Sequence, residues 1–299
     1  MKKFIILLLL SLLFIVFLSG CAIGSKVDLV KGEERIEEKI DKIKIEWTYG
    51  NVDVVYHDEN YISAIEESDK LTMECTVSGT TLHIKNDILV NFGFVFNSPR
   101  KTLTLSLPKS LVLKELNITT TSADVNIDKI NSKKTDINTT SGIIEADLSS
   151  EETVSIGSVS GSISLNTDSN IDSLKLQSTS GEINAALCEV NDAEFGTVSG
   201  DIDVVSEKIT ESETSTTSGK ISMKMSASPN ECEIGTVTGR IKLYLPENSG
   251  FTANISTVSG KIESDFDMNK DGNTYTYGDG GAELKIDTTS GDIKLEKIQ

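Results

Sequence analysis

Charged residues recur at one position of a repeated sequence unit. Each directly follows a triplet such as Thr-Ser-Gly, and the set comprises Asp124, Glu182, Asp201, Lys220, Arg240 and Lys261. Carboxylates that converge with a basic residue can cleave polysaccharides, and glycoside hydrolysis needs two carboxyl groups about 5 to 9.5 Å apart. The same position also holds Ile143 and Ser162, and its charges have both signs, which is typical of a solvated face. We therefore expect no catalytic residues and a non-enzymatic protein, with a polysaccharide-active lyase or hydrolase as the alternative.

The sequence offers few ligands for a metal ion. His57 and His83 are the only imidazoles, so chemistry that needs several histidines is excluded. The run from Asp267 to Gly272 matches the first half of an EF-hand loop, but its twelfth position is Gly278 where a bidentate Glu belongs. We interpret this run as a polar insertion and expect no metal site and no cofactor.

The N-terminus has the layout of a secretory signal. Lys2 and Lys3 precede an apolar run over residues 4–18, and Leu-Ser-Gly-Cys follows at residues 18–21. The run is shorter than the roughly 20 residues of a membrane-spanning helix. The tetrapeptide resembles the bacterial lipobox, which implies that residues 1–20 are a signal peptide and that Cys21 is lipidated. The expected location is the extracytoplasmic face of the bacterial membrane.

Charge narrows the range of partners. The chain has 28 basic and 46 acidic residues, a net charge of −18, and loss of Lys2 and Lys3 changes this to 26 − 46 = −20. A protein this acidic is a poor ligand for nucleic acid. It is also repelled by an anionic membrane, so we expect membrane attachment through lipid on Cys21. Cys75, Cys188 and Cys232 are interpreted as small apolar fillers without a disulfide.

One triplet recurs through the second half of the chain. Its third residues are Ala123, Gly142, Gly161, Gly181, Gly200, Gly219, Gly239, Gly260 and Gly291, spaced by 19, 19, 20, 19, 19, 20, 21 and 31 residues. A narrow period of this kind indicates a repeat architecture. Two residues before the Gly, Thr alternates with Val along the sequence. The Val residues interrupt the threonine array that ice binding needs and so argue against this third function, which a freezing-hysteresis assay tests.

Apolar residues keep fixed places in each unit. The position two residues after the Gly is β-branched throughout, from Val125 to Ile293, and the position five residues before it is apolar except at Thr214. These columns have a period of two on each side of the Gly but change parity across it. The chain therefore turns a corner there, which we attribute to the φ angles that Gly permits and to backbone hydrogen bonds of the preceding Ser.

Identical corners every 19–20 residues predict an all-β fold, a parallel β-solenoid in which each strand pairs with its equivalent one coil later. Residues 119–299 would form the regular repeats. Residues 41–118 keep strand alternation and a Val77-Ser78-Gly79 triplet but lose the period, so we expect an irregular N-terminal β cap. Residues 21–40 are interpreted as a polar spacer.

Several motifs together resemble the bacterial putative-adhesin family of repetitive β-solenoid proteins, which includes LiaG-like envelope proteins. They are the Thr-Ser-Gly-x-Ile units, Leu-x-Leu-Pro at residues 105–108 and 243–246, and Tyr-Gly-Asp-Gly-Gly at residues 277–281. The resemblance covers roughly residues 41–299. It implies a surface-associated, non-catalytic protein linked to adhesion or envelope stress. We expect a binding or scaffold role toward an envelope polymer or an envelope protein.

Overall fold

The structure is a computed structural model that describes residues 30–68, 71–86, 101–149 and 152–298. These residues form strands, turns and bends, and no helix occurs among them. The expected all-β class is confirmed. Cys21 and the signal-peptide residues 1–20 lie outside the described residues, so the lipidation site stays a prediction.

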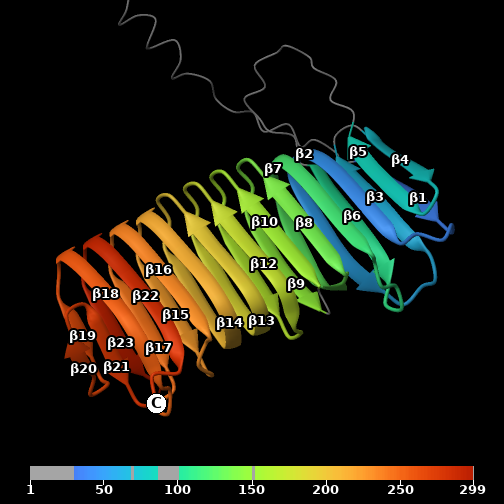
Figure 1. The fold of residues 1–299 in the computed structure, drawn as a ribbon. Coiled ribbons are helices and arrows are strands. Elements are labelled where there is room, and N and C mark those ends of the chain that lie inside the picture. The colour runs from blue at the N-terminus through green and yellow to red at the C-terminus, as the bar shows by residue number, and fades with distance from the viewer. Residues whose placement is uncertain (1–29, 69–70, 87–100, 150–151, 299) are drawn as a thin grey trace, which may run out of the picture.

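The strands divide into an N-terminal group, a central group and a C-terminal group (Figure 1). The N-terminal strands are β1 (Val30–Ile36), β2 (Lys42–His57), β3 (Ile62–Ser68), β4 (Met73–Ser78), β5 (Thr81–Asn86) and β6 (Lys101–Pro108). The central strands are β7 (Glu115–Asn131), β8 (Lys134–Thr139), β9 (Ile144–Ser149), β10 (Thr153–Ser158), β11 (Ile163–Thr167), β12 (Ile171–Ser178), β13 (Ile183–Thr197) and β14 (Ile202–Ser218). The C-terminal strands are β15 (Ile221–Met225), β16 (Glu231–Thr238), β17 (Ile241–Leu245), β18 (Phe251–Ser259), β19 (Ile262–Ser264), β20 (Asn269–Asp271), β21 (Thr274–Tyr277), β22 (Ala282–Ser290) and β23 (Ile293–Lys297).

The central strands form two facing layers joined by sharp corners along one edge (Figure 1). The incoming face contains the segments that lead into a corner, such as β8, β10 and β12. The outgoing face contains the segments that leave it, such as β9 and β11. The long strands β13 and β14 pass from the outgoing to the incoming face, so one strand contributes to both layers.

Parallel pairing repeats at the interval of the sequence motif. Ile163 pairs with Ile144 on one side and with Ile183 on the other. The column two residues after the corner is buried at Ile144, Ile163, Ile183, Ile202, Ile221, Ile241 and Ile293. Each buried isoleucine stabilises the fold by about 1.5–3 kcal/mol relative to an exposed one. The predicted inward column is thus the core of the stack.

Thr214, the polar residue in the otherwise apolar column five residues before the Gly, has a hydrogen-bond partner in the core. Thr214 is fully buried at the position that is otherwise apolar. Its hydroxyl lies 3.3 Å from the sulfur of Met223, on the opposite layer. A weak acceptor there reduces the cost of burying the hydroxyl.

The N-terminal end pairs differently from the central stack. β1 pairs with β3, β3 with β6, and β4 with β5, all antiparallel, while β2 pairs in parallel with β5, β6 and β7. Val77-Ser78-Gly79 belongs to the tight β4–β5 hairpin, with φ of +63° at Gly79, and is not a corner. β1 lies within the range expected to be a spacer, so residues 30–36 belong to the fold instead.

The last coil is out of sequence order. β22 pairs with β16 on one side and with β18 on the other, and β23 likewise lies between β17 and β19. The expectation that every strand pairs with its equivalent one coil later is therefore wrong at this end. The segment between β19 and β22 forms the antiparallel pair β20–β21, which covers the outer edge of β18. This detour accounts for the 31-residue interval between the last two glycines.

Candidate binding surface

Each corner places two small side chains on the outside of the molecule. The corner surface is defined here by two exposed columns of residues. The outer column contains Thr121, Thr140, Val159, Thr179, Val198, Thr217, Val237, Thr289 and Val258, and the second contains Ser122, Ser141, Ser160, Ser180, Ser199, Ser218, Thr238, Ser290 and Ser259. All eighteen are exposed and none is charged. Nine corners about 4.8 Å apart give a surface of about 38 Å in length.

The corner glycines are needed for close backbone approach. Among the described residues, positive φ values occur at other glycines, such as Gly50 and Gly79, and at none of the repeated corners. A Cβ built on Gly200 would lie 2.0 Å from the carbonyl oxygen of Gly181 on the preceding coil. The expectation that these glycines supply unusual φ angles is therefore wrong. Glycine is required because successive corners stack with their backbones in contact.

A hydroxyl three residues before the Gly, buried at most corners and half-buried at Thr257, holds the corner together. The hydroxyl oxygen of Thr197 accepts the N–H of Gly200 at 3.1 Å, and its O–H donates to the carbonyl of Gly181 at 3.3 Å. Ser178 makes the same two contacts with Gly181 and Gly161. The expectation that the Ser immediately before the Gly bonds the corner backbone is wrong, because its side chain is exposed to solvent. Its hydroxyl is free for an external partner.

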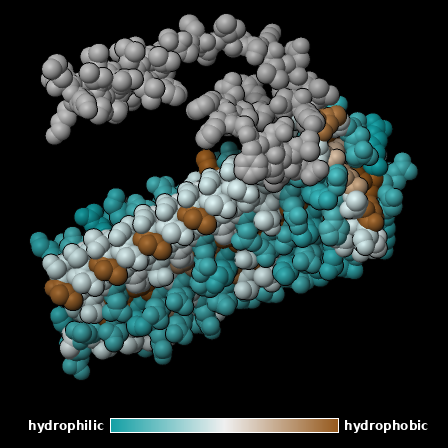
Figure 2. Space-filling view, turned by 90° about the horizontal axis from the view of Figure 1, so that it is seen from above, coloured by the Kyte–Doolittle hydropathy of each residue, from teal (hydrophilic) through white to brown (hydrophobic). Residues whose placement is uncertain are grey.

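The order of the coils in the stack makes Thr and Val alternate regularly in the outer column. In the sequence, Val237 and Val258 follow one another and Thr289 comes last. In the stack, the coil of Thr289 lies between those of Val237 and Val258. From Thr140 onward the column therefore alternates Thr and Val without a break. Figure 2 shows the apolar members as separate spots at regular intervals along this edge.

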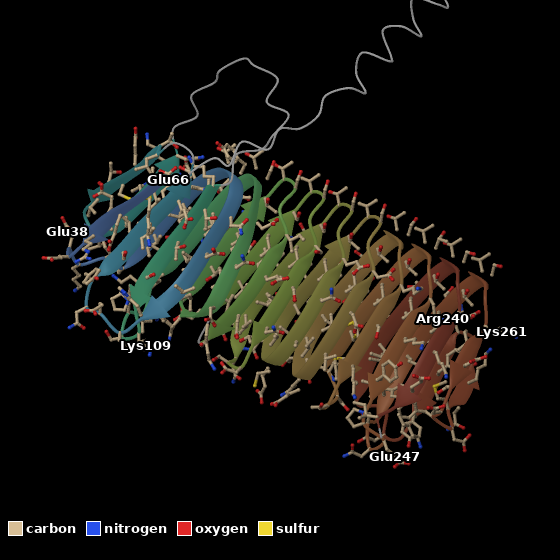
Figure 3. All side chains as sticks on the ribbon, turned by 180° about the vertical axis from the view of Figure 1, so that it is seen from behind. Glu38, Glu66, Lys109, Arg240, Glu247 and Lys261 are labelled. Atoms are coloured by element: carbon tan, nitrogen blue, oxygen red, sulfur yellow. The ribbon has the colours of Figure 1, made fainter. Side chains whose placement is uncertain are left out.

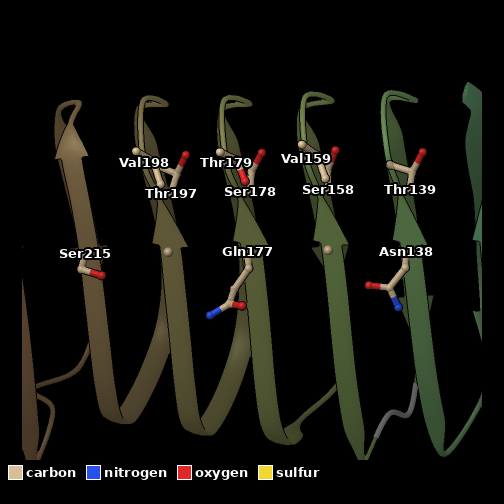
Figure 4. Close-up of a pocket in the computed structure, with 12 residues that line it drawn as sticks. Asn138, Thr139, Ser158, Val159, Gln177, Ser178, Thr179, Thr197, Val198 and Ser215 are labelled. Atoms are coloured by element: carbon tan, nitrogen blue, oxygen red, sulfur yellow. The ribbon is translucent and has the colours of Figure 1, made fainter. Parts of the chain in front are cut away.

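A polar groove runs along the incoming face next to the corner surface (Figure 4). It has a volume of about 460 Å³. The column that forms its floor lies four residues before the corner Gly and contains Asn138, Gly157, Gln177, Gly196 and Ser215. Val159 and Val198 of the corner surface line its upper side. The groove joins amide and hydroxyl groups to two apolar side chains.

The floor of the groove also has a period of two coils. Polar residues occur in the coils with an outer Thr, whereas Gly157, Gly196 and Gly235 occur in three of the four coils with an outer Val, and the coil of Val258 has Ser256. The repeat of this surface is therefore 39 residues long, as the intervals from Gly157 to Gly196 to Gly235 show. The sequence contains this signal as Gly-Ser-Val and Gly-Thr-Val units, which become visible only when units two coils apart are compared.

The charged residues that follow the corners form a column on the outgoing side. Asp124, Asp201 and Asp292 each accept the backbone N–H of the residue at the same position on the next coil, at 2.8 to 3.0 Å. Asp201 also lies 3.8 Å from Lys220. Arg240 and Lys261, at the C-terminal end in Figure 3, have Asp292 between them. These contacts give the column a structural task.

The candidate calcium loop is part of an insertion. Asp267 precedes β20, and Gly272 has φ of +62° at the turn between β20 and β21. Within the described ranges, no group of three or more His, Cys, Asp or Glu side chains is placed to hold a metal ion. The two histidines lie apart on β2 and β5, and His57 Nε2 contacts the carbonyl of Tyr61 at 2.6 Å.

A buried ion pair lies at the N-terminal end, where Figure 3 labels Glu66. Glu66 Oε1 and Lys101 Nζ are 2.9 Å apart, with side chains 1% and 3% exposed. Burial by itself would raise the pKa of Glu66, but Lys101 and the N–H groups of Thr72 and Met73 outweigh it and hold that pKa below its ordinary 4.5. Lys101 also lies 4.9 Å from the centroid of the Trp47 ring. No sequence pattern indicates this pair, because neither residue belongs to a repeated unit.

The three described cysteines are free thiols. Cys232 is buried between Ser212 and Leu284 of the neighbouring strands, and burial raises its pKa to about 11. Burial also raises the pKa of Cys75 to about 11. Cys188 is partly exposed and donates to Glu207 Oε2 at 3.5 Å, so its interpretation as an apolar filler is wrong.

The sequence was compared with known protein families. The sequence of residues 40–296 matches the family described as Toastrack DUF4097. The chain belongs to this family. A comparison with curated protein sequences finds no match. The resemblance read from the Thr-Ser-Gly-x-Ile units is confirmed, since solved structures of similar Toastrack-like fold include putative adhesins.

Two solved structures illustrate the shared fold. A putative lipid binding protein from Parabacteroides distasonis is 19% identical, with 91% of this chain and 97% of that chain covered and a TM-score of 0.52. A putative adhesin from the same organism is 12% identical, with the same coverage and a TM-score of 0.51. Likeness at this level of identity shows the fold alone. In the described part of the Toastrack chain, no helix has the length and hydropathy to cross a membrane.

Proposed function

We propose that the protein is a non-catalytic binding or scaffold protein of the bacterial cell envelope. The observation that carries the proposal is the corner surface, an uninterrupted uncharged strip on a chain with a net charge of −18. Charged side chains are costly to desolvate, whereas small hydroxyl and methyl groups are readily covered by a partner. The names of structurally similar proteins, putative adhesin and putative lipid binding protein, support a binding role.

The regular coils suit a scaffold. We infer that the chain winds as a parallel β-solenoid of 19–20-residue coils with an irregular N-terminal cap. Each coil then presents the same groups to the outside at a spacing of about 4.8 Å. A stiff rod with identical neighbouring sites can engage an extended partner over many coils.

Attachment to the membrane is part of the proposal. Lipid on Cys21 would hold the acidic body at the extracytoplasmic face, since each buried CH₂ of an acyl chain contributes about 0.8 kcal/mol. A link to the envelope-stress response comes from the family resemblance. Metabolic labelling with a palmitate analogue tests the anchor, with the expected label lost in Cys21→Ser.

Cosedimentation tests the binding role. Residues 22–299 are incubated with isolated cell walls and with membranes, and the supernatant is analysed by mass spectrometry. Saturable sedimentation without released fragments is the expected result. Released wall fragments would identify the alternative, a polysaccharide-active enzyme. Absence of both binding and release would contradict an envelope-polymer ligand and direct the search to a membrane protein.

A further inference from the structure

We propose that the polar groove binds a single extended chain of a neutral β-1,4-linked polysaccharide that lies along the stack. The inference rests on the proposed binding function and names the class of ligand. It comes from the period, the polarity and the charge of the groove, which are separate observations.

The period of the groove matches that of such a glycan. Asn138, Gln177 and Ser215 recur on every second coil, with Gly157 and Gly196 between them. Two coils measure about 10 Å, which is the length of one disaccharide in an extended β-1,4-linked chain. Successive sugars in that chain are turned over, so equivalent groups face the protein once per disaccharide. Alternating polar side chains and glycine gaps fit this alternation.

The chemistry of the lining suits sugar hydroxyls. Side-chain amides both donate and accept hydrogen bonds, as hydroxyl groups do. Gln177 donates through Nε2 to Glu194 Oε1 at 2.7 Å, which fixes the amide and leaves its oxygen directed away from that bond. Val159 and Val198 on the upper side are each 48% exposed. They offer apolar contact to the C–H groups of a pyranose ring.

Charge selects a neutral polymer. The net charge of −18 disfavours polyanions such as phosphate-rich wall polymers. The corner surface and the groove floor from Asn138 to Ser215 contain no charged side chain. A neutral glycan can therefore cover the floor itself without the desolvation of an ion, while the carboxylates of Asp136 and Glu194, which accept hydrogen bonds from Asn138 and Gln177, lie beside it.

The length of the groove sets the size of the ligand. The floor from Asn138 to Ser215 spans five coils, or about 19 Å between the outer two. This accommodates about two disaccharides. We expect affinity to increase up to a tetrasaccharide and to change little for longer oligomers.

Calorimetric titration of the full-length protein with β-1,4-linked oligomers of N-acetylglucosamine, from two to six sugars, tests the proposal. The α-1,4-linked hexamer of glucose serves as the comparison ligand. Gln177→Ala removes an amide, and we expect about fivefold weaker binding, the equivalent of one hydrogen bond. Gly196→Gln fills a gap and should abolish binding. Its added Cβ meets nothing closer than 3.8 Å, so the variant is expected to fold, which thermal unfolding checks.

The matched control is Asn184→Ala, an exposed amide on the outgoing face of β13. It should bind as the unaltered protein does. Equal affinity for the α-linked hexamer, no dependence on length up to four sugars, or wild-type binding by Gly196→Gln would overturn the proposal. If the oligomers do not bind while cell walls still sediment the protein, the glycan assignment fails and the envelope-binding function stands. If neither the oligomers nor the cell walls bind, the glycan assignment and the envelope-polymer ligand both fail.

Discussion

Asp292 Oδ2 lies 3.8 Å from Arg240 Nη2 on the neighbouring coil, although the coil that contains Lys261 separates them in sequence. Asp292 also accepts the backbone N–H of Lys261 at 3.0 Å. Sequential stacking would place the cations Arg240 and Lys261 on adjacent coils. Insertion of the last coil places a carboxylate between them and also completes the alternation of Thr and Val on the corner surface.

Disulfide trapping tests this order of coils. Thr238 and Ser290 lie on neighbouring strands, so cysteines there have Cα atoms about 5 Å apart, within disulfide range. Thr238→Cys with Ser290→Cys should crosslink on mild oxidation. Thr238→Cys with Ser259→Cys, two coils apart at about 10 Å, should not. Peptide mapping by mass spectrometry identifies the bond, and the opposite pattern would show sequential stacking.

The corner glycines should be intolerant of a methyl group. Gly200→Ala places Cβ 2.0 Å from a backbone carbonyl, and we expect a loss on the order of 3 kcal/mol in the free energy of unfolding. Gly235→Ala is the matched control, because nothing lies within 4 Å of its added Cβ. It should gain about 0.5–1 kcal/mol by reducing the freedom of the unfolded chain. Urea titrations of both variants measure the difference.

The buried hydroxyl of each corner should matter more than the exposed one. Thr197→Val keeps the shape but removes the contacts to Gly200 and Gly181. Leaving buried backbone groups without partners costs about 1–3 kcal/mol. Ser199→Ala, at the exposed position of the same corner, should change stability by less than about 0.5 kcal/mol. Equal effects in denaturant titrations would show that the hydroxyl is not structural.

The ion pair of Glu66 and Lys101 should make stability depend on acid pH. Because the pKa of Glu66 is lower in the folded state, its contribution is present above the ordinary value of 4.5 and is lost as pH falls through the folded-state value. Glu66→Gln should lose about 3–5 kcal/mol at pH 7, since Lys101 is left buried without its partner.

The double variant Glu66→Gln, Lys101→Met serves as the control for that loss. It should recover much of the stability at pH 7 and lack this part of the acid dependence. Urea titrations at pH 7, 5 and 3.5 measure both effects. A Glu66→Gln variant as stable as the unaltered protein would show that the pair is not buried.

The thiols should differ in reactivity. Alkylation requires the thiolate, and Cys232 is buried with a pKa raised to about 11. Cys232 should stay unmodified by iodoacetamide at pH 8 until the protein unfolds, while Cys188, which is partly exposed, reacts first. Because burial raises the pKa of Cys232, the protonated thiol also stabilises the folded state. This contribution is complete below the ordinary pKa of 9.0 and is lost as pH rises through about 11. Peptide mass spectrometry identifies each site.

The sequence by itself determined the all-β class, the corners and the core columns. A period of two on each side of Gly142, with a change of parity across it, requires strands that meet at a turn. The β-branched column from Val125 to Ile293 is inward because only one face of each strand can be buried. These signals are local and repeat nine times, so a single exception such as Thr214 does not obscure them.

The tertiary structure decided what depends on neighbours in space. It showed that Gly200 is needed for contact with Gly181 and that Thr197, not Ser199, holds the corner, because both facts arise between coils. It brought Glu66 to Lys101 across 35 residues of sequence. It also placed the coil of Thr289 between those of Val237 and Val258, an order that pairing energies along the stack select and that no local pattern encodes.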